Sequence, residues 1–188
     1  MILDAKFRAR KEESGRLRGN LPQRASDLGR WSMRIALASD HAGFLLKGEI
    51  AELLHELGHE TVDFGVPSTD PADLPDHVYP AALAVGRGEV DRGIFVDGVG
   101  YGSALIANRI AGVDAVVCQD PFCARLAREH TDSNVLCLGG KIIGSAIALE
   151  IVRVWMTTDF LNTEKYIKRV DKVREISKRH LVPLDQLG

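Results

Sequence analysis

Residues 92–110 read R-G-I-F-V-D-G-V-G-Y-G-S-A-L-I-A-N-R-I, and their pattern decides the fold. The apolar run at 94–96 is typical of a buried parallel strand, and Asp97 stands where that run ends. Three glycines then occupy alternate positions, at Gly98, Gly100 and Gly102. An apolar helical pattern begins at Ala104. The stretch therefore predicts a strand, a glycine-rich turn and a helix in direct succession.

The glycine-rich turn predicts a site for an anion. Glycine adopts positive φ without strain and has no Cβ to obstruct a ligand, so several backbone N–H groups can converge at the start of the next helix. Asp97 would lie beside these amides, which suits proton transfer at a carbon whose neighbouring oxygen becomes charged. The dinucleotide spacing G-x-G-x-x-G is not met, which argues against a nicotinamide site. A turn that only lets a helix pack close to a sheet is the alternative.

Strands and helices alternate along the chain from residue 33 onward. Apolar runs predict five strands, at residues 34–38, 60–64, 94–96, 114–117 and 135–138, with helical patterns between them. This alternation predicts an α/β fold, in which helices cover both faces of a five-stranded parallel sheet. Right-handed crossovers favour the strand order 2-1-3-4-5.

In that strand order, ligands bind in the crevice between strands one and three. The loops after these two strands carry Asp40 and His41 on one side and Asp97 and Gly98 on the other. The sequence therefore predicts that acid, imidazole and glycine residues meet at one edge of the sheet. His130 lies at a helix end before strand five, where a catalytic role and a capping role are equally open.

Residues 163–180 predict a charged helix with apolar residues at helical spacing and no strand after it. Such an appended helix often packs on a second subunit, so we expect a homodimer, or a tetramer built from two dimers. Lys165 and Arg169 are four residues apart and share one face of this helix. Two cations on one face can bind one phosphate, and a solvated cationic face is the alternative.

Residues 1–32 differ from the domain that we expect at 33–188, because they are basic and contain few core-forming residues. Since Met33 directly precedes strand one, we expect translation to begin there and the extension to be non-native or flexible. A basic arm for a partner or RNA is the alternative.

The composition predicts a cytoplasmic protein with no general affinity for nucleic acid or membrane. The formal net charge is -2, and no apolar run has the length of a membrane span or the form of a signal peptide. Cys118, Cys123 and Cys137 lack the spacing of a zinc site, and we expect all three to be small buried apolar residues.

Three motifs in combination carry a family resemblance. They are A-S-D-H-A-G-F-L-L-K at 38–47, G-E-V-D-R-G-I-F-V-D-G-V-G-Y-G-S-A-L-I-A-N-R at 88–109, and A-R-E-H-T-D-S-N-V-L-C-L-G-G at 127–140. With them, residues 33–180 resemble the ribose-5-phosphate isomerase B and galactose-6-phosphate isomerase family. The resemblance implies a flavodoxin-like or Rossmann-like αβα sandwich, and a dimer with its sites between subunits. It also implies aldose–ketose isomerisation of a sugar phosphate, of the ribose 5-phosphate/ribulose 5-phosphate type, through a cis-enediol without metal or organic cofactor.

The resemblance also implies roles for individual residues. Asp40 and His130 match the pair that assists ring opening, and Asp97 stands at the position of the base. The substrate would be bound by His41, Gly98, Gly100, Gly102, Ser103, Thr131, Lys165 and Arg169. The glycine amides would hold the enediolate oxygen, and the two cations the phosphate. Because an aspartate with an ordinary pKa is a poor base at neutral pH, we expect burial to raise the pKa of Asp97.

Several positions differ from the family pattern. Asp97 replaces a cysteine that is catalytic in many of these enzymes, and Ser103 stands where another branch has a glutamate. Thr131 replaces an asparagine, Leu74 an aromatic residue and Lys165 an arginine. These differences leave the sugar open among tetrose, pentose and hexose phosphates. They also leave two alternatives: a non-catalytic sugar-phosphate binding module, and one subunit of a hetero-oligomeric isomerase of the galactose-6-phosphate type.

Overall fold

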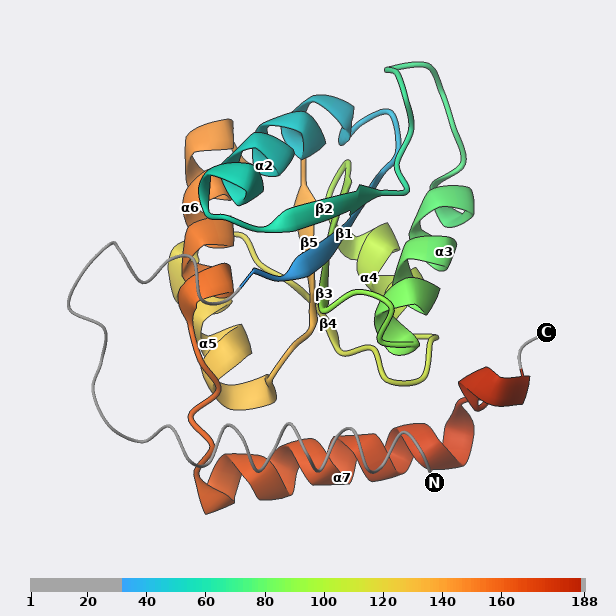
Figure 1. Ribbon diagram of the computed structural model, residues 1–188, viewed down its shortest axis with the longest axis vertical. Coiled ribbons are helices and arrows are strands. Elements are labelled where there is room, and N and C mark those ends of the chain that lie inside the picture. The colour runs from blue at the N-terminus through green and yellow to red at the C-terminus, as the bar shows by residue number, and fades with distance from the viewer. Residues whose placement is uncertain (1–31, 187–188) are drawn as a thin grey trace. The chain divides into compact units, whose positions relative to one another are not determined.

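The computed structural model describes residues 32–186, and it places a five-stranded sheet at the centre of this part of the chain (Figure 1). The strands are β1 (Arg34–Ser39), β2 (Glu60–Asp63), β3 (Arg92–Asp97), β4 (Ala115–Val117) and β5 (Val135–Gly139). Every pairing between them is parallel. The predicted α/β class is confirmed, whereas the predictions for the basic extension lie outside the described residues.

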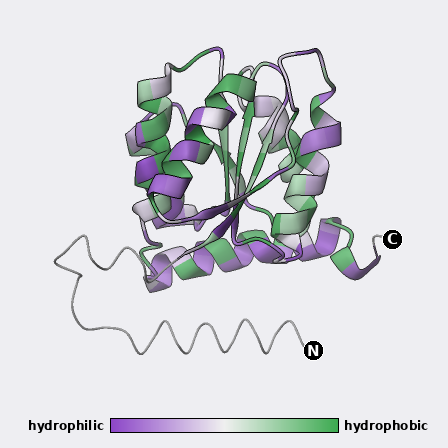
Figure 2. Ribbon diagram, turned by 45° about the horizontal axis from the view of Figure 1, so that its top comes forward, coloured by the Kyte–Doolittle hydropathy of each residue, from purple (hydrophilic) through white to green (hydrophobic). Residues whose placement is uncertain are grey.

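Helices cover both faces of the sheet and give it three layers. One face packs against α2 (Phe44–Glu56), α5 (Pro121–Thr131) and α6 (Ser145–Thr157), and the other against α3 (Leu74–Gly86) and α4 (Tyr101–Ala107). Figure 2 shows the apolar strands between these helices. No helix within residues 32–186 has the length and apolar character needed to cross a membrane.

The predicted strand order 2-1-3-4-5 is wrong, because the observed order is β2-β1-β3-β5-β4. Burial explains the exchange of the last two strands. All five residues of β5 are buried, whereas the three residues of β4 are only partly buried. The more apolar β5 therefore lies in the interior of the sheet, and the short β4 is an edge strand.

The observed order gives the end of β3 a special place. The helices that follow β1 and β5 lie on one face of the sheet, while the helix that follows β3 lies on the other. After β3 the chain therefore passes to the opposite face of the sheet from the one it takes after both neighbouring strands. Open α/β sheets bind ligands at such points. The turn after β3 therefore lies between two such points instead of beside the one predicted.

The loops at the carboxyl ends of the strands pack backbone against backbone. A Cβ added to Gly43 would lie 2.2 Å from the carbonyl oxygen of Val96, and one added to Gly140 would lie 2.8 Å from that of Ala42. The amide of Gly140 also donates to the carbonyl of Asp97 at 2.7 Å. The loops after β1, β3 and β5 therefore form one contiguous surface.

One detail of the sequence prediction is confirmed only in part. Helix α3 begins at Leu74, with Pro75 in its first turn, where a missing N–H costs no hydrogen bond. Cys118 and Cys137 are buried as expected, but Cys123 is exposed on α5.

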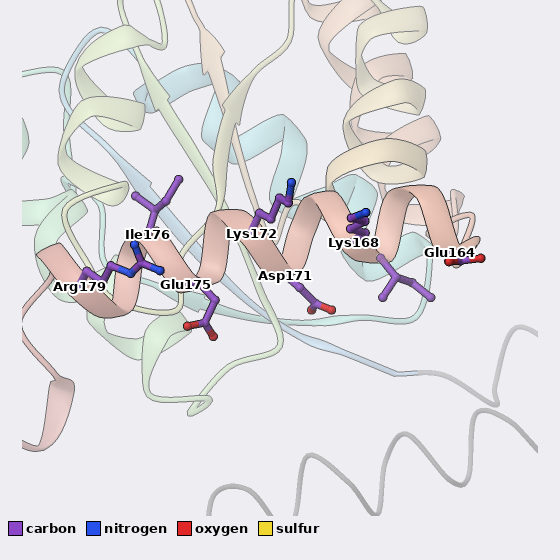
Figure 3. Close-up of a pocket in the computed structure, with 8 residues that line it drawn as sticks. Glu164, Lys168, Asp171, Lys172, Glu175, Ile176 and Arg179 are labelled. Atoms are coloured by element: carbon purple, nitrogen blue, oxygen red, sulfur yellow. The ribbon is translucent and has the colours of Figure 1, made fainter.

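The predicted C-terminal helix is confirmed as α7 (Glu164–His180), which runs past the edge where the strands begin (Figure 1). Only Val170 of this helix is buried. A shallow hollow along α7 is lined by Glu164, Ile167, Lys168, Asp171, Lys172, Glu175, Ile176 and Arg179 (Figure 3). Acidic and basic side chains alternate there, and none of the predicted site residues lines it.

We expect Gly43→Ala to destabilise the protein strongly, because the new methyl group would overlap the carbonyl of Val96. Overpacking of this kind costs about 1–3 kcal/mol. Gly48→Ala is the matched control, since nothing lies within 4 Å of its added Cβ and its helix position favours alanine by about 0.5–1 kcal/mol. Urea unfolding of both variants measures the difference, and equal stabilities would contradict the close packing of the loops.

Candidate active site

Asp97 ends β3 with its carboxylate inside the glycine-rich turn, and its side chain is only 4% exposed. Its Oδ1 accepts hydrogen bonds from the amides of Val99 at 2.8 Å and Gly100 at 2.6 Å. Its Oδ2 accepts from the amide of Ser103 at 2.8 Å and from the Ser103 hydroxyl at 2.6 Å. Gly100 has a φ of +84°, which only glycine adopts readily. Of the three glycine amides expected to hold a substrate oxygen, only that of Gly100 donates to this carboxylate, and the other two amide donors are Val99 and Ser103.

These contacts decide the protonation of Asp97. Burial raises its pKa and is the largest single influence, but the hydrogen bonds from the Ser103 hydroxyl and from three backbone amides together outweigh it. The net result is a pKa below the ordinary value of 3.8, so the expectation of a raised pKa is wrong. In this conformation Asp97 is a firmly ionised acceptor and a weak base.

Asp40 and His41 lie at the same edge of the sheet as Asp97, as the sequence predicts. The Oδ1 atom of Asp40 accepts from the amides of Ala42 at 2.9 Å and Gly43 at 3.2 Å, which fixes the loop after β1. His41 Nδ1 accepts from the amide of Ala72 at 3.4 Å, in the loop that leads to α3. Both side chains are partly buried and border the crevice between β1 and β3.

His130 and Thr131 lie at the opposite edge of the sheet, because they end α5 just before β5 begins. The His130 ring stacks on Tyr166 of α7 with a centroid distance of 4.4 Å. Lys165 Nζ and Arg169 Cζ lie 5.1 Å and 5.6 Å from the centre of the Tyr166 ring. A cavity of about 360 Å³ is lined by His130, Thr131 and Arg169 among other residues. The structure therefore groups three predicted residues around one aromatic ring, and Thr131 lines the cavity beside them.

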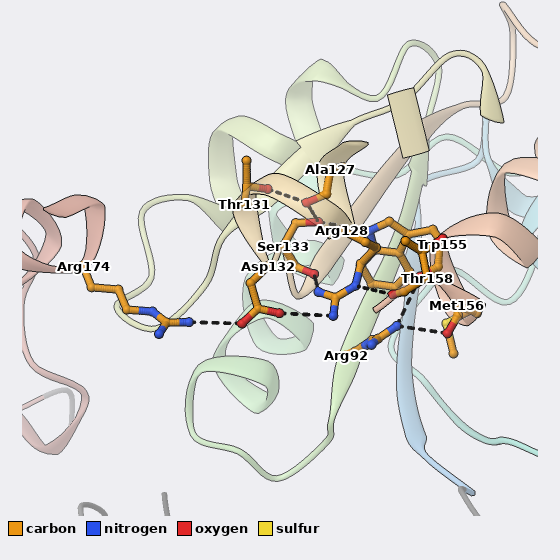
Figure 4. Close-up of polar contacts among 10 residues, drawn as sticks. All are labelled: Arg92, Ala127, Arg128, Thr131, Asp132, Ser133, Trp155, Met156, Thr158 and Arg174. Atoms are coloured by element: carbon orange, nitrogen blue, oxygen red, sulfur yellow. Dashed lines mark hydrogen bonds and ion pairs between the residues drawn. The ribbon is translucent and has the colours of Figure 1, made fainter. Parts of the chain in front are cut away.

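A network of arginines, of which Arg128 is buried, fixes the end of α5 beside this group (Figure 4). Arg128 donates to the carbonyls of Ser133 and Thr158 and forms an ion pair with Asp132 at 3.1 Å. Arg174 of α7 reaches the same Asp132 at 3.4 Å. Asp132 ends the helix with a φ of 52°. The residues before it, including His130, are therefore held on a rigid support.

Trp155 is the apolar centre of the same network. The guanidinium carbons of Arg92 and Arg128 lie 5.1 Å and 5.7 Å from its ring, and its indole N–H donates to the Ser133 hydroxyl at 3.0 Å. Burial, followed by the charge of Arg128, lowers the pKa of Arg92 to about 10. Both arginines remain cations at neutral pH, satisfied by carbonyls and an aromatic face.

The two groups of predicted residues lie at opposite ends of the strands. Asp40 and Asp97 follow the carboxyl ends of β1 and β3, whereas His130 precedes the amino end of β5. At about 3.3 Å per residue, strands of this length separate the two ends by roughly 15–20 Å. The predicted pair of Asp40 and His130 is therefore not brought together within one chain.

Comparison with known proteins bears on both groups. The family model for ribose/galactose isomerases matches residues 35–173. The chain belongs to this family. It is 40% identical over 146 residues to ribose-5-phosphate isomerase B of Escherichia coli, which covers 78% of this chain and 97% of that protein.

Solved structures of relatives agree with the fold. Ribose-5-phosphate isomerase B of Clostridium thermocellum has a TM-score of 0.76 and 41% identity, over 79% of this chain and 99% of that one. The enzyme of Mycoplasma genitalium, solved with bound ribulose 5-phosphate, has a TM-score of 0.75 and 32% identity, over 79% of this chain and 99% of that one. The family resemblance and the αβα fold are confirmed.

Lys141 borders the glycine-rich turn, and the sequence prediction missed it. Its amide donates to the carbonyl of Gly98 at 3.0 Å, and its Cδ lies 3.6 Å from the position of a Cβ on Gly98. The side chain is exposed, so a cation borders the glycine-rich turn. The wrong strand order hid it, because β5 was expected two places away from β3. The glycine pair just before it, Gly139 and Gly140, was the available signal.

We expect Asp97→Asn to destabilise the protein by about 1.5–3 kcal/mol at pH 7, the size of a buried hydrogen bond to a charged group. The asparagine would place a donor against amide donors. Because the folded-state pKa of Asp97 lies below its unfolded value, its stabilisation is complete above about pH 4 and is lost as the pH falls through the folded-state pKa. Urea unfolding between pH 7 and pH 3 should show the difference shrink on acidification. A constant difference would contradict this account.

Proposed function

We propose that this protein is an aldose–ketose isomerase that interconverts a phosphorylated aldose and ketose through a cis-enediol. A base removes a proton from the carbon beside the carbonyl and returns it to the neighbouring carbon, while the hydroxyl proton moves between the two oxygens. The turn after β3 carries the proposal, because it puts a carboxylate and converging amides between two points where open α/β sheets bind ligands. The family supports it, since its relatives are named for this reaction and one was solved with ribulose 5-phosphate.

We propose further that two chains build each site. The edge with Asp40, His41, Asp97 and Lys141 would bind the reacting carbons, and the edge with His130, Thr131, Lys165 and Arg169 would open the sugar ring and grip the phosphate. Since these edges lie at opposite ends of one sheet, a second copy is needed to bring them face to face. The exposed apolar residues of α7, Val173 and Ile176, support a partner on this helix. The proposed assembly is a symmetric homodimer.

Asp97 acts as the base in this proposal only after it leaves its hydrogen bonds in the turn. Those bonds keep its pKa low, while burial acts in the opposite direction. If Asp97 also releases Ser103 when a substrate oxygen takes over the amides of Val99 and Gly100, burial alone remains and the pKa of Asp97 rises toward that of a useful base. The same amides then stabilise the enediolate.

One observation favours a second candidate function. A carboxylate that accepts four hydrogen bonds and has a lowered pKa is suited to holding a turn, as in a non-catalytic sugar-phosphate binding module. Binding of aldose and ketose phosphates without turnover or proton exchange supports this function. Activity that appears only with a partner chain supports a hetero-oligomeric isomerase.

For location we propose the cytoplasm, which the three free cysteines support.

We expect two inactive variants to restore each other when mixed. Asp97→Ala removes the base from one edge, and His130→Ala removes the imidazole from the other. In a mixed symmetric dimer, one site carries both substitutions and the other carries neither. Refolding the two variants together should therefore recover about a quarter of the wild-type activity. No recovery, with mixed dimers verified by mass spectrometry, would place both residues in sites made by one chain.

We expect Asp97→Asn to reduce turnover by about 10²–10⁴-fold, the contribution of a positioned base. Ser103→Ala is the matched variant, because it removes one hydrogen bond and keeps the carboxylate. Loss of that bond raises the pKa of Asp97, so the acidic limb of the pH–rate profile should move to higher pH. Both variants are assayed with tetrose, pentose and hexose phosphates in deuterated solvent. Normal proton exchange by Asp97→Asn would remove Asp97 from the mechanism.

A further inference from the structure

Tyr166 makes a specific contact with His130 that joins α7 to the end of α5. Its hydroxyl lies 2.9 Å from His130 Nε2, and the two rings are stacked with an interplanar angle of 11°. Both side chains are partly buried. The contact combines a hydrogen bond, whose direction depends on the imidazole tautomer, with a ring face, which restricts rotation of the imidazole.

A fixed partner on one imidazole nitrogen determines what the other nitrogen can do. Neutral histidine carries its proton on either Nδ1 or Nε2, and a partner that donates to one nitrogen favours the tautomer with the proton on the other. With Tyr166 at Nε2, the nitrogen left for a ligand is Nδ1. Within residues 32–186, Nδ1 of His130 makes no hydrogen bond.

The supports of both rings are themselves fixed. Lys165 and Arg169 place their cations 5.1 Å and 5.6 Å from the centre of the Tyr166 ring, and contacts of this kind restrain an aromatic side chain. Helix α7 is anchored by buried Val170 and by the ion pair between Arg174 and Asp132. The hydroxyl of Tyr166 is therefore held in place by contacts other than the one with His130.

We propose that Tyr166 is a positioning residue for His130, whose hydroxyl selects the tautomer of the imidazole and leaves Nδ1 to exchange a proton with the sugar-ring oxygen. This rests on the proposed role of His130 in ring opening. A donated hydroxyl proton at Nε2 keeps the proton of neutral His130 on Nδ1, which then protonates the ring oxygen as the ring carbon–oxygen bond breaks. The anomeric hydroxyl gives its proton to a second group at the site. Tyr166 also links the phosphate-binding cations to the imidazole that opens the ring.

Tyr166→Phe tests the proposal, because it keeps the aromatic ring and the neighbouring cations and removes only the hydroxyl. The first measurement is the ¹⁵N NMR spectrum of the His130 ring, assigned by its loss in His130→Ala. Wild-type protein should show one dominant tautomer, and Tyr166→Phe should show a mixture. Lys172→Met is the matched control, since it removes an exposed cation of α7 and leaves the hydroxyl of Tyr166 and the anchors of the helix in place. Its His130 spectrum should match that of wild type.

The second measurement separates positioning from general damage. Turnover of Tyr166→Phe should fall by roughly threefold to tenfold on sugar phosphates that cyclise, the range that one hydrogen bond supports. The loss should be smaller on tetrose phosphates, because these sugars cannot cyclise and need no ring opening. The KM of Tyr166→Phe should change little. Unchanged His130 nitrogens in Tyr166→Phe, or an equal loss on both kinds of sugar, would overturn the proposal. Since the NMR arm needs no turnover, a protein that isomerises no sugar would refute the proposed function and still report the tautomer.

Discussion

The placement of one carboxylate at the end of β3 is the constraint on which the rest of the molecule depends. Asp97 satisfies the amides of the glycine-rich turn, and the carbonyl of the same residue accepts from Gly140 in the loop after β5. The side chain therefore orders α4, and the backbone joins the loops after β3 and β5 into one surface. A neutral side chain of the same shape could not satisfy all of these donors, which explains why a buried charge is tolerated here.

Much of the fold followed from local patterns in the sequence. Apolar runs separated by helical segments located every strand to within two residues, and crossover handedness brought Asp40, His41 and Asp97 to one edge. The exchange of β4 and β5 was not predictable in this way. Both strands are short apolar runs, and the choice between centre and edge depends on how completely each is buried by helices far away in sequence. Lys141 was missed for that reason.

The chemistry of the site depended on details that no pattern contains. The sequence indicated that Asp97 would be buried, and burial does raise its pKa. The sign of the net shift is set by the direction of the carboxylate, which accepts from the amides of Val99, Gly100 and Ser103. The contact between Tyr166 and His130 likewise depends on how α7 lies across α5. Side-chain direction and helix docking depend on the three-dimensional structure. For Asp97, the side-chain rotamer separates a base from a structural acceptor.

In the homodimer that we propose, the separation of the two groups of residues accounts for the form of the C-terminal helix. A single sheet cannot bring the carboxyl ends of β1 and β3 close to the amino end of β5, however its loops vary. A symmetric pair of sheets can, because a two-fold axis sets unlike edges of the two chains face to face. Helix α7 buries only Val170 in its own chain, yet it carries Lys165, Tyr166 and Arg169 beside His130. A helix that completes the site of another chain needs this combination of a small anchor and a large exposed surface.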